Sequence, residues 1–259
     1  MSGSSDQQNS SAMRPVKVRL DVWLVDLGHF ESREKAQRAI MAGNVLVNEV
    51  VIDKPGTKVL SDRTVRVRKA DRYVGRGGYK LEGALNAFGI HPEGRVCLDV
   101  GASTGGFTDC LLQRGAKRVF AVDVGQNQLH HRLQMDPRVT SFEKINARRL
   151  EATLFDEIPD FFVADVSFIS LELILPSVRE VLAPRGEGVV LIKPQFELAK
   201  ELVGKGGIVR EPERRAMAVE KIRSAALAGG WEWLGVEASV IAGMDGNQEF
   251  LAYLKKGDQ

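Results

Sequence analysis

Two carboxylates and a run of glycines form the part of this chain that is best suited to binding a small organic ligand. Asp99 lies two positions before a glycine-rich turn that begins at Gly101, and Asp123 follows a second apolar segment. Glycines let the backbone approach a ligand closely, and a carboxylate at the next strand end can accept both hydroxyls of a ribose. Asp99 suits a cationic amino group better than a phosphate. Together these features indicate S-adenosylmethionine.

The glycine turn differs from a dinucleotide fingerprint, because Ser103 occupies the second glycine position of G-x-G-x-x-G. A pyrophosphate cradle is therefore not expected. The alternative is a tight turn between strand and helix that binds no ligand, and the acidic strand ends favour a ligand site. Phe107 fits the protein core as well as the turn, and Asn146 fits a helix cap as well as an adenine contact. The expected cofactor-binding residues are Asp99, Gly101, Ser103, Thr104, Gly105, Gly106, Phe107, Asp123, Asn146 and Asp165.

Two further charged residues directly follow buried-looking strands. Asp165 comes after 161–164 and Lys193 after 189–192. Charged groups at such strand ends belong to sites more often than to ordinary surface. A partly desolvated lysine near a second cation can accept a proton, and a carboxylate can orient it. Taken alone, Lys80 fits a surface cation and Glu249 fits a solubilising charge at a strand edge.

The elements that position these residues alternate between strand and helix, which predicts a doubly wound, mostly parallel α/β sheet. Lys80 is expected at the start of a helix that leads into the first strand. The last two strands have no helix between them and should pair antiparallel. We expect strands over 96–100, 118–122, 161–164, 188–192, 233–240 and 249–255, and helices over 107–113, 127–134, 171–182 and 212–227.

The front of the chain predicts a separate α+β module of two helices followed by a small sheet. Gly28 ends the first helix, and Ser32 is a suitable N-cap for the second. A hairpin over 45–52 and a strand over 65–67 follow. We expect a disordered tail over 1–15, the small module over 16–71, a basic glycine-rich linker over 72–79 and the large domain over 80–259.

Composition excludes several classes of protein. The 259 residues are 44% hydrophobic and 27% charged, which is typical of a globular protein, and no apolar run approaches the ~20 residues of a membrane span. The N-terminus lacks the pattern of a secretion signal. Cys97 and Cys110 provide neither a zinc set nor a disulfide framework, and the histidines form no metal set, so we expect no metal and a reduced, cytoplasmic setting.

The charge is distributed unevenly between the two ends of the chain. Residues 1–80 hold 15 Lys and Arg against 9 Asp and Glu, a balance of +6, whereas the remainder holds 21 against 25, a balance of −4. A basic front end predicts contact with a polyanion. A solvated charged face is the alternative. The candidate RNA-binding cations are Arg14, Lys17, Arg19, Arg33, Lys35, Arg38, Arg66, Arg68, Arg72 and Arg76.

Long, ordered segments in both parts of the chain are similar to one known family. From about Val16 onward the chain resembles the TlyA family of ribosomal RNA ribose 2′-O-methyltransferases, which also carry the name haemolysins. The front module resembles the RNA-binding domain of ribosomal protein S4. The segments that carry the resemblance are 19–21, 32–33, 45–48, 73–81, 99–109, 165–170 and 191–197, together with Ala36, Ile40 and Gly43.

The resemblance implies a fold, a cofactor and a catalytic set. It implies a Rossmann-like class I methyltransferase domain with a seven-stranded sheet, and S-adenosylmethionine as cofactor. Related ribose methyltransferases of the FtsJ type use a Lys-Asp-Lys-Glu tetrad, which Lys80, Asp165, Lys193 and Glu249 match. By this resemblance Lys193 is the base, Asp165 and Lys80 assist it, and Glu249 holds the lysines. The residues themselves leave open which lysine is neutral.

The resemblance also implies a substrate, namely cytidine riboses of 16S or 23S RNA within 30S or 50S subunits. No membrane partner is expected, and a monomer is assumed. One alternative is a methyltransferase of the same fold that acts on another RNA, an amine or a protein; the place of an amino-methylation motif reads Asp165-Val166-Ser167-Phe168, which disfavours amines. A membrane-lytic haemolysin lacks a spanning or strongly amphipathic segment. A non-catalytic RNA chaperone would not need the lysine–carboxylate set.

Overall fold

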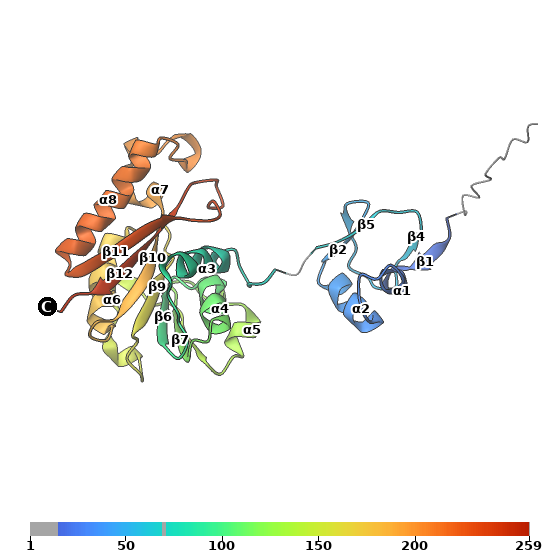
Figure 1. The fold of residues 1–259 in the computed structure, drawn as a ribbon, viewed down its shortest axis with the longest axis horizontal. Helices are drawn as coiled ribbons and strands as arrows, with labels where there is room; N and C mark the ends of the chain where they lie inside the picture. Colours follow the sequence, from blue (N-terminus) through green and yellow to red (C-terminus); the bar gives the residue numbers. More distant parts are fainter. Residues whose placement is uncertain (1–14, 69–70, 259) are drawn as a thin grey trace, which may run out of the picture. The chain divides into compact units, whose positions relative to one another are not determined.

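A computed structural model describes residues 15–68 and 71–258, so Arg14 of the predicted RNA-binding set lies outside the described residues. The chain divides into two compact units between Asp71 and Arg72 (Figure 1). Among residues 15–68 and 71–258, none of the helices combines the length and the apolar character that membrane crossing requires.

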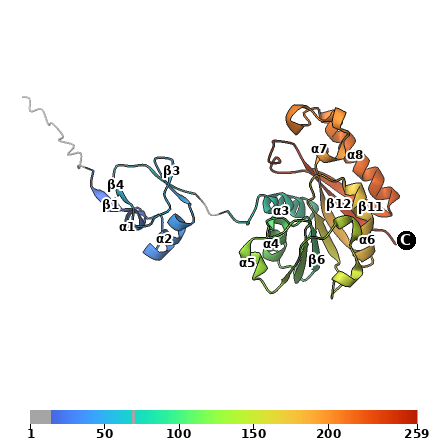
Figure 2. The same ribbon diagram turned by 180° about the vertical axis from the view of Figure 1, so that it is seen from behind.

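The smaller unit packs two helices against two small antiparallel sheets (Figure 2). Its elements are β1 (Lys17–Arg19), α1 (Leu20–Asp26), α2 (Arg33–Met41), β2 (Val45–Val47), β3 (Val50–Val51), β4 (Lys58–Leu60) and β5 (Val65–Val67). Ser32 caps α2 as expected, since its side chain accepts a hydrogen bond from the Lys35 N–H. The pairing of β1 with β4 was not anticipated, because the two strands are three residues each and lie far apart in sequence.

In the larger unit, seven strands form one sheet in the order β11-β12-β10-β9-β6-β7-β8, which confirms the predicted mostly parallel α/β architecture. The strand β12 runs opposite to the other six, and its pairing with β11 is the antiparallel pair that was expected. The strands are β6 (Val96–Val100), β7 (Arg118–Val122), β8 (Val139–Phe142), β9 (Phe161–Ala164), β10 (Glu187–Ile192), β11 (Trp231–Ala238) and β12 (Phe250–Lys256).

Helices cover both faces of this sheet (Figure 1). On one face lie α3 (Gly77–Phe88), α4 (Gly106–Gln113) and α5 (His131–Gln134); on the other lie α6 (Leu175–Val181) and α8 (Pro212–Ala228). Each strand contributes to both faces by alternation, so that Phe161 packs under the first set and Phe162 under the second. Short helical segments complete the unit: η1 (Ala147–Arg149), η2 (Ala152–Leu154), η3 (Leu171–Leu173), α7 (Pro194–Glu197), η4 (Lys200–Leu202) and η5 (Lys205–Gly207).

Two expected helices are shorter than the sequence indicated. The helix expected over 127–134 begins only at His131, and Asn127 adopts a φ of 52°, which a right-handed helix does not accommodate. The helix expected over 171–182 is divided into η3 and α6, and α6 has Pro176 in its first turn. Proline has no N–H to continue a preceding turn, so the helix begins anew there.

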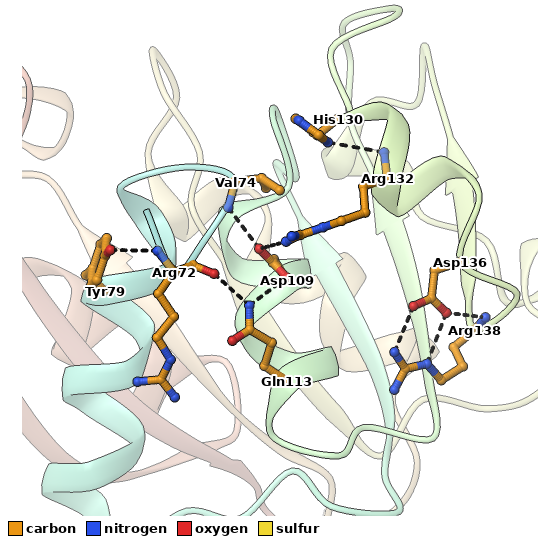
Figure 3. A network of polar contacts seen from close by, with 9 residues as sticks. All are labelled: Arg72, Val74, Tyr79, Asp109, Gln113, His130, Arg132, Asp136 and Arg138. Carbon is orange, nitrogen blue, oxygen red and sulfur yellow. Dashed lines mark hydrogen bonds and ion pairs between the residues drawn. The ribbon is translucent and has the colours of Figure 1, made fainter. Parts of the chain in front are cut away.

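The stretch 72–79, expected as a linker, packs within the larger unit. Tyr73 is buried, and α3 already begins at Gly77. The carboxylate of Asp109 on α4 accepts hydrogen bonds from the Val74 N–H at 2.8 Å, from Gln113 Nε2 at 3.0 Å and from Arg132 at 2.7 Å (Figure 3). Asp109 therefore joins the segment before α3 to α4 and α5.

Candidate active site

The register of the sheet brings three of the four predicted catalytic residues to one edge. Ile192 pairs with Phe250 across β10 and β12, and Val190 pairs with Ala164 across β10 and β9. Lys193, Glu249 and Asp165 each occupy the next position beyond these pairs. This is the carboxyl edge of the parallel strands, where open α/β sheets bind their ligands.

The fourth residue, Lys80 on α3, forms a buried ion pair with Glu249. Lys80 Nζ donates a hydrogen bond to Glu249 Oε2 at 2.5 Å, and the two side chains are only 10% and 3% exposed. The hairpin that precedes β12 encloses this carboxylate closely, because a Cβ placed on Gly243 would lie 2.6 Å from Glu249 Oε1. A side chain at that position would therefore displace the Glu249 carboxylate.

Lys193 and Asp165 form a second lysine–carboxylate pair at the same edge. Lys193 Nζ lies 2.5 Å from Asp165 Oδ1 and donates a hydrogen bond to Ser167 Oγ at 2.9 Å. The first turn of α3, which carries Lys80, also approaches Asp165: a Cβ built on Gly77 would lie 3.8 Å from Asp165 Oδ2. The structure therefore brings all four predicted catalytic residues together as two adjacent pairs.

A cavity of about 530 Å³ opens beside these pairs, and Asp165 contributes to its wall. Four other predicted cofactor-binding residues line the cavity, namely Gly101, Ser103, Asp123 and Asn146. Its volume lies within the range of roughly 300–1,000 Å³ that is typical of small-molecule sites. Asp165 therefore belongs both to the cavity and to a lysine–carboxylate pair.

The turn that follows β6 is held in shape by the carboxylate at the end of β7. Asp123 accepts hydrogen bonds from the Ser103 N–H at 2.8 Å and from the Gly125 N–H at 2.7 Å. Each carboxylate oxygen retains acceptor capacity for a ribose hydroxyl. Gly101 has a φ of 83°, and a Cβ there would lie 2.4 Å from the Asp165 carbonyl oxygen. The turn thus requires glycine at this position.

Five predicted cofactor-binding residues do not line the cavity: Asp99, Thr104, Gly105, Gly106 and Phe107. Asp99 is completely buried, and its Oδ2 accepts a hydrogen bond from Thr108 Oγ1 at 2.6 Å. Its other oxygen, Oδ1, has no hydrogen-bond partner among the described residues. Burial, above all, raises the pKa of Asp99 to about 7, and the nearby carboxylates of Asp165 and Asp123 add to the shift.

Several residues of the cavity wall were not predicted. They include Val124, Gln128 and Phe168. Phe168 has a φ of 63° and is 90% exposed, which is an unusual combination for an aromatic residue. Its ring lies 4.9 Å from that of Phe196, measured between ring centroids. All three follow strand ends or turns beside predicted site residues, and this proximity is the signal that could have indicated them.

Among the predicted RNA-binding residues of the smaller unit, four are engaged in ion pairs. Arg19 and Arg33 both contact the buried carboxylate of Asp21, at 2.9 and 2.8 Å. Hydrogen bonding from Arg19 is the largest cause that holds the pKa of Asp21 well below its usual range. Lys35 pairs with Glu31 and Arg66 with Glu49. By contrast, Lys17, Arg38 and Arg68 make no ion pair within residues 15–68 and 71–258.

The two remaining predicted RNA-binding residues belong to the larger unit. Arg72 pairs with Glu82 on α3, and Arg76 donates a hydrogen bond to the carbonyl oxygen of Ala242 at 2.7 Å. Arg76 therefore holds the loop between β11 and β12, which leads to Glu249. Both arginines therefore have structural partners within the larger unit.

Comparison with known proteins agrees with the division of the chain into two compact units. Residues 73–256 match the family described as FtsJ-like methyltransferase, and residues 18–65 match the S4 domain. The 16S/23S rRNA (cytidine-2′-O)-methyltransferase TlyA of Mycobacterium tuberculosis is 44% identical over 242 residues, covering 92% of this chain and 90% of that protein. A solved "putative hemolysin" from Streptococcus thermophilus is 46% identical, with a TM-score of 0.72, covering 94% of this chain and 90% of that chain.

A more distant structure supports the fold alone. An S-adenosylmethionine dependent methyltransferase from Mesorhizobium loti is 15% identical, with a TM-score of 0.52, and covers 70% of this chain and 100% of that chain. Each of the two family matches lies within one compact unit, whereas the match to the Mycobacterium tuberculosis protein extends across both units. The chain therefore belongs to the TlyA family of rRNA methyltransferases, and its larger unit is an FtsJ-like methyltransferase domain.

Proposed function

We propose that this protein transfers a methyl group from S-adenosylmethionine to the ribose 2′-hydroxyl of cytidine in ribosomal RNA, within ribosomal subunits in the cytoplasm. The observation that carries the proposal is the position of Asp165, which lines the cavity and also pairs with Lys193. A methyl donor in the cavity and a hydroxyl beside the lysines would therefore meet at one carboxylate. The name of the Mycobacterium tuberculosis relative supports the choice of cytidine and of rRNA.

The residues of the cavity fit S-adenosylmethionine. Asp123 is placed to accept ribose hydroxyls, and the backbone at Gly101 leaves the space that a side chain would fill. Asn146 lies on the part of the wall that follows β8. Asp99 is completely buried and would act through its hydrogen bond with Thr108 on α4, the helix that follows the turn. The bound cofactor supplies an electrophilic methyl group on sulfur.

The two lysine–carboxylate pairs would activate and position the 2′-hydroxyl. In its neutral amine form, Lys193 would accept the proton that the 2′-hydroxyl loses as its oxygen takes the methyl group that the bound cofactor would supply. Asp165 and Ser167 fix the position of the Lys193 amine through the contacts described above. Lys80, held by Glu249, places a positive charge where the oxygen becomes negative. Holding both reactants in line supplies much of the rate enhancement.

The S4 domain would hold the RNA by its backbone. Lys17, Arg38 and Arg68 are the best candidates for phosphate contacts, because they make no ion pair within the described residues. Arg14, Arg19, Arg33, Lys35, Arg66, Arg72 and Arg76 stay predictions of the same kind. Such contacts position a folded RNA without reading its sequence.

The test is methyl transfer from labelled S-adenosylmethionine to purified 30S and 50S subunits, followed by mapping of 2′-O-methylated nucleotides. We expect wild type to modify cytidine, and Lys193→Ala to lose at least roughly a hundredfold in rate, the range of general-base catalysis. Lys117→Ala is the matched control, because Lys117 is an exposed lysine paired with Glu157. Labelling of a base, or of another RNA in place of either subunit, would contradict the proposal and favour a different methyltransferase activity.

A further inference from the structure

Another buried carboxylate follows Lys193 in the chain without belonging to the catalytic pairs. Glu197 ends α7 and is 4% exposed. It lies four residues after Lys193 in the chain. Burial raises its pKa, while hydrogen bonds from Ser170 and Leu171 oppose that shift. A carboxylate in this position costs free energy unless its hydrogen bonds are satisfied, so its contacts must account for its presence.

Both oxygens of Glu197 bind the segment that follows Asp165. Ser170 Oγ donates a hydrogen bond to Glu197 Oε2 at 2.5 Å, and the Leu171 N–H donates to Oε1 at 3.0 Å. Ser170 ends the loop of residues 165–170, most of which lines the cavity, and Leu171 begins η3 directly after it. Glu197 therefore joins the loop that carries Asp165 to the helix that directly follows Lys193.

The directions of the hydrogen bonds at Ser170 require that residue 197 carries a carboxylate rather than an amide. Ser170 Oγ already accepts hydrogen bonds from the Glu172 N–H at 3.3 Å and from Lys221 Nζ at 3.4 Å. A serine hydroxyl has two acceptor lone pairs and one donor hydrogen, so its hydrogen must go to an acceptor. Leu171 likewise presents an N–H. Lys221 Nζ also lies 3.9 Å from Glu197 Oε2, so every group that faces the carboxylate donates. A glutamine amide would turn its NH₂ toward a donor in either orientation.

We propose that Glu197 is a positioning residue for methyl transfer: by clamping residues 170–171 to the end of α7, it fixes the spacing of Asp165 and Lys193 and the wall of the cofactor cavity. The proposal rests on the function proposed above. Glu197 touches neither reactant. Its effect passes through the loop of residues 165–170 to two readouts at once, the affinity for cofactor and the rate of the chemical step.

The test compares Glu197→Gln and Ser170→Ala with wild type in the full-length protein. We expect roughly tenfold weaker binding of S-adenosylhomocysteine by calorimetry for Glu197→Gln, the effect of one disrupted buried hydrogen bond. We also expect a lower kcat, with KM for ribosomal subunits unchanged. Ser170→Ala removes only one of the two clamp contacts, so its effect has the same direction and a smaller size. Glu172→Gln is the control, because Glu172 pairs with the same Lys221 at 3.1 Å but is part-exposed and outside the clamp.

A merely structural role gives a different result. Variants that unfold at lower temperature but bind S-adenosylhomocysteine and turn over as wild type does would overturn the proposal. If Glu197→Gln does not fold, Ser170→Ala decides, since it removes one hydroxyl and leaves the carboxylate in place. Binding of S-adenosylhomocysteine is measured without RNA, so failure of the positioning role of Glu197 can be told apart from failure of the proposed function. A wild type that binds S-adenosylhomocysteine but modifies neither subunit contradicts the proposed function and leaves the cofactor test of Glu197 valid.

Discussion

At the scale of single residues, the site is defined by lysine and carboxylate charges held in two pairs, one buried and one partly buried. Lys80 with Glu249 and Lys193 with Asp165 each place a cation against a carboxylate at 2.5 Å. Burying two charges has a desolvation cost that the attraction between them offsets only with good geometry, so such pairs are weak sources of stability. The presence of both lysine–carboxylate pairs at one sheet edge is better explained by a role in methyl transfer than by a contribution to stability.

Asp99 leads to a prediction about pH. Its pKa is about 7 in the folded protein, against 3.8 for an unperturbed group, so between these values the folded state keeps a proton that the unfolded state loses. The free energy of unfolding should therefore be highest at acid pH and fall as pH rises toward 7. The slope that Asp99 contributes is at most about 1.4 kcal/mol per pH unit. Asp99→Asn should remove this slope, as measured by urea unfolding from pH 5 to 8.

The control for this measurement is Asp136→Asn. Arg138 lowers the pKa of Asp136, so its contribution is present above the unfolded pKa and is lost only at more acid pH. Its substitution should leave the pH dependence between 5 and 8 unchanged. If Asp99→Asn shows the same slope as wild type in that interval, the protonated state of Asp99 is not the cause.

At the scale of elements, the turn between β6 and α4 matters because it touches the loop that follows β9. A Cβ at Gly101 would meet the carbonyl of Asp165, the residue shared by cavity and catalytic pair. A small change in the turn therefore displaces Asp165, which is remote from Gly101 in sequence but adjacent to it in space. Parallel neighbouring strands place their following loops side by side, which explains this contact.

Gly101→Ala should consequently weaken cofactor binding by tenfold or more, because the added methyl group forces Asp165 to move. Its control is Gly94→Ala: Gly94 also has a positive φ, 74°, but a Cβ there meets nothing within 4 Å. Both variants carry the backbone strain of roughly 1–2 kcal/mol that alanine has in this conformation. Calorimetry with S-adenosylhomocysteine separates them, and equal affinities in the two variants would show that crowding at Asp165 has no effect.

At the scale of the whole molecule, the chain assigns two tasks to two units. The S4 domain carries the excess of positive charge, and the methyltransferase domain carries the cavity and the lysine–carboxylate pairs. Four of the predicted RNA-binding cations of the S4 domain are already paired with carboxylates, so fewer of its positive charges are available to RNA.

The salt dependence of binding to ribosomal subunits should depend on the unpaired cations. Replacing Lys17, Arg38 and Arg68 by alanine should lower the slope of log K against log salt by about 2, given roughly 0.7–0.9 per phosphate contact. Cofactor affinity should stay unchanged. The control replaces Lys117, Arg185 and Arg223, exposed cations of the larger unit that are paired with carboxylates. An equal change of slope in both triple variants would argue for general charge rather than an S4 contact.

The sequence alone determined those features that depend on neighbours along the chain. Short apolar runs separated by helical stretches specified the strands β6, β7, β9 and β10, and the charged residue after an apolar run specified the ends at Asp165 and Lys193. The N-cap at Ser32 is local for the same reason. Because parallel strands end at one edge, a site at that edge could also be predicted. The resemblance to the family then supplied Lys80 and Glu249, whose isolated contexts were uninformative.

Only the tertiary structure decided the contacts between distant segments. Lys80 and Glu249 are 169 residues apart, and their ion pair exists because α3 crosses the edge at which β12 begins. Asp99 was expected beside the ligand, but it lies on the strand face that α4 covers, where Thr108 binds it. The clamp at Glu197 arises in the same way, because the loop after β9 meets the short helix α7 that follows β10. Local sequence specifies backbone conformation and burial, whereas pairing between side chains depends on the packing of elements that are remote in the chain.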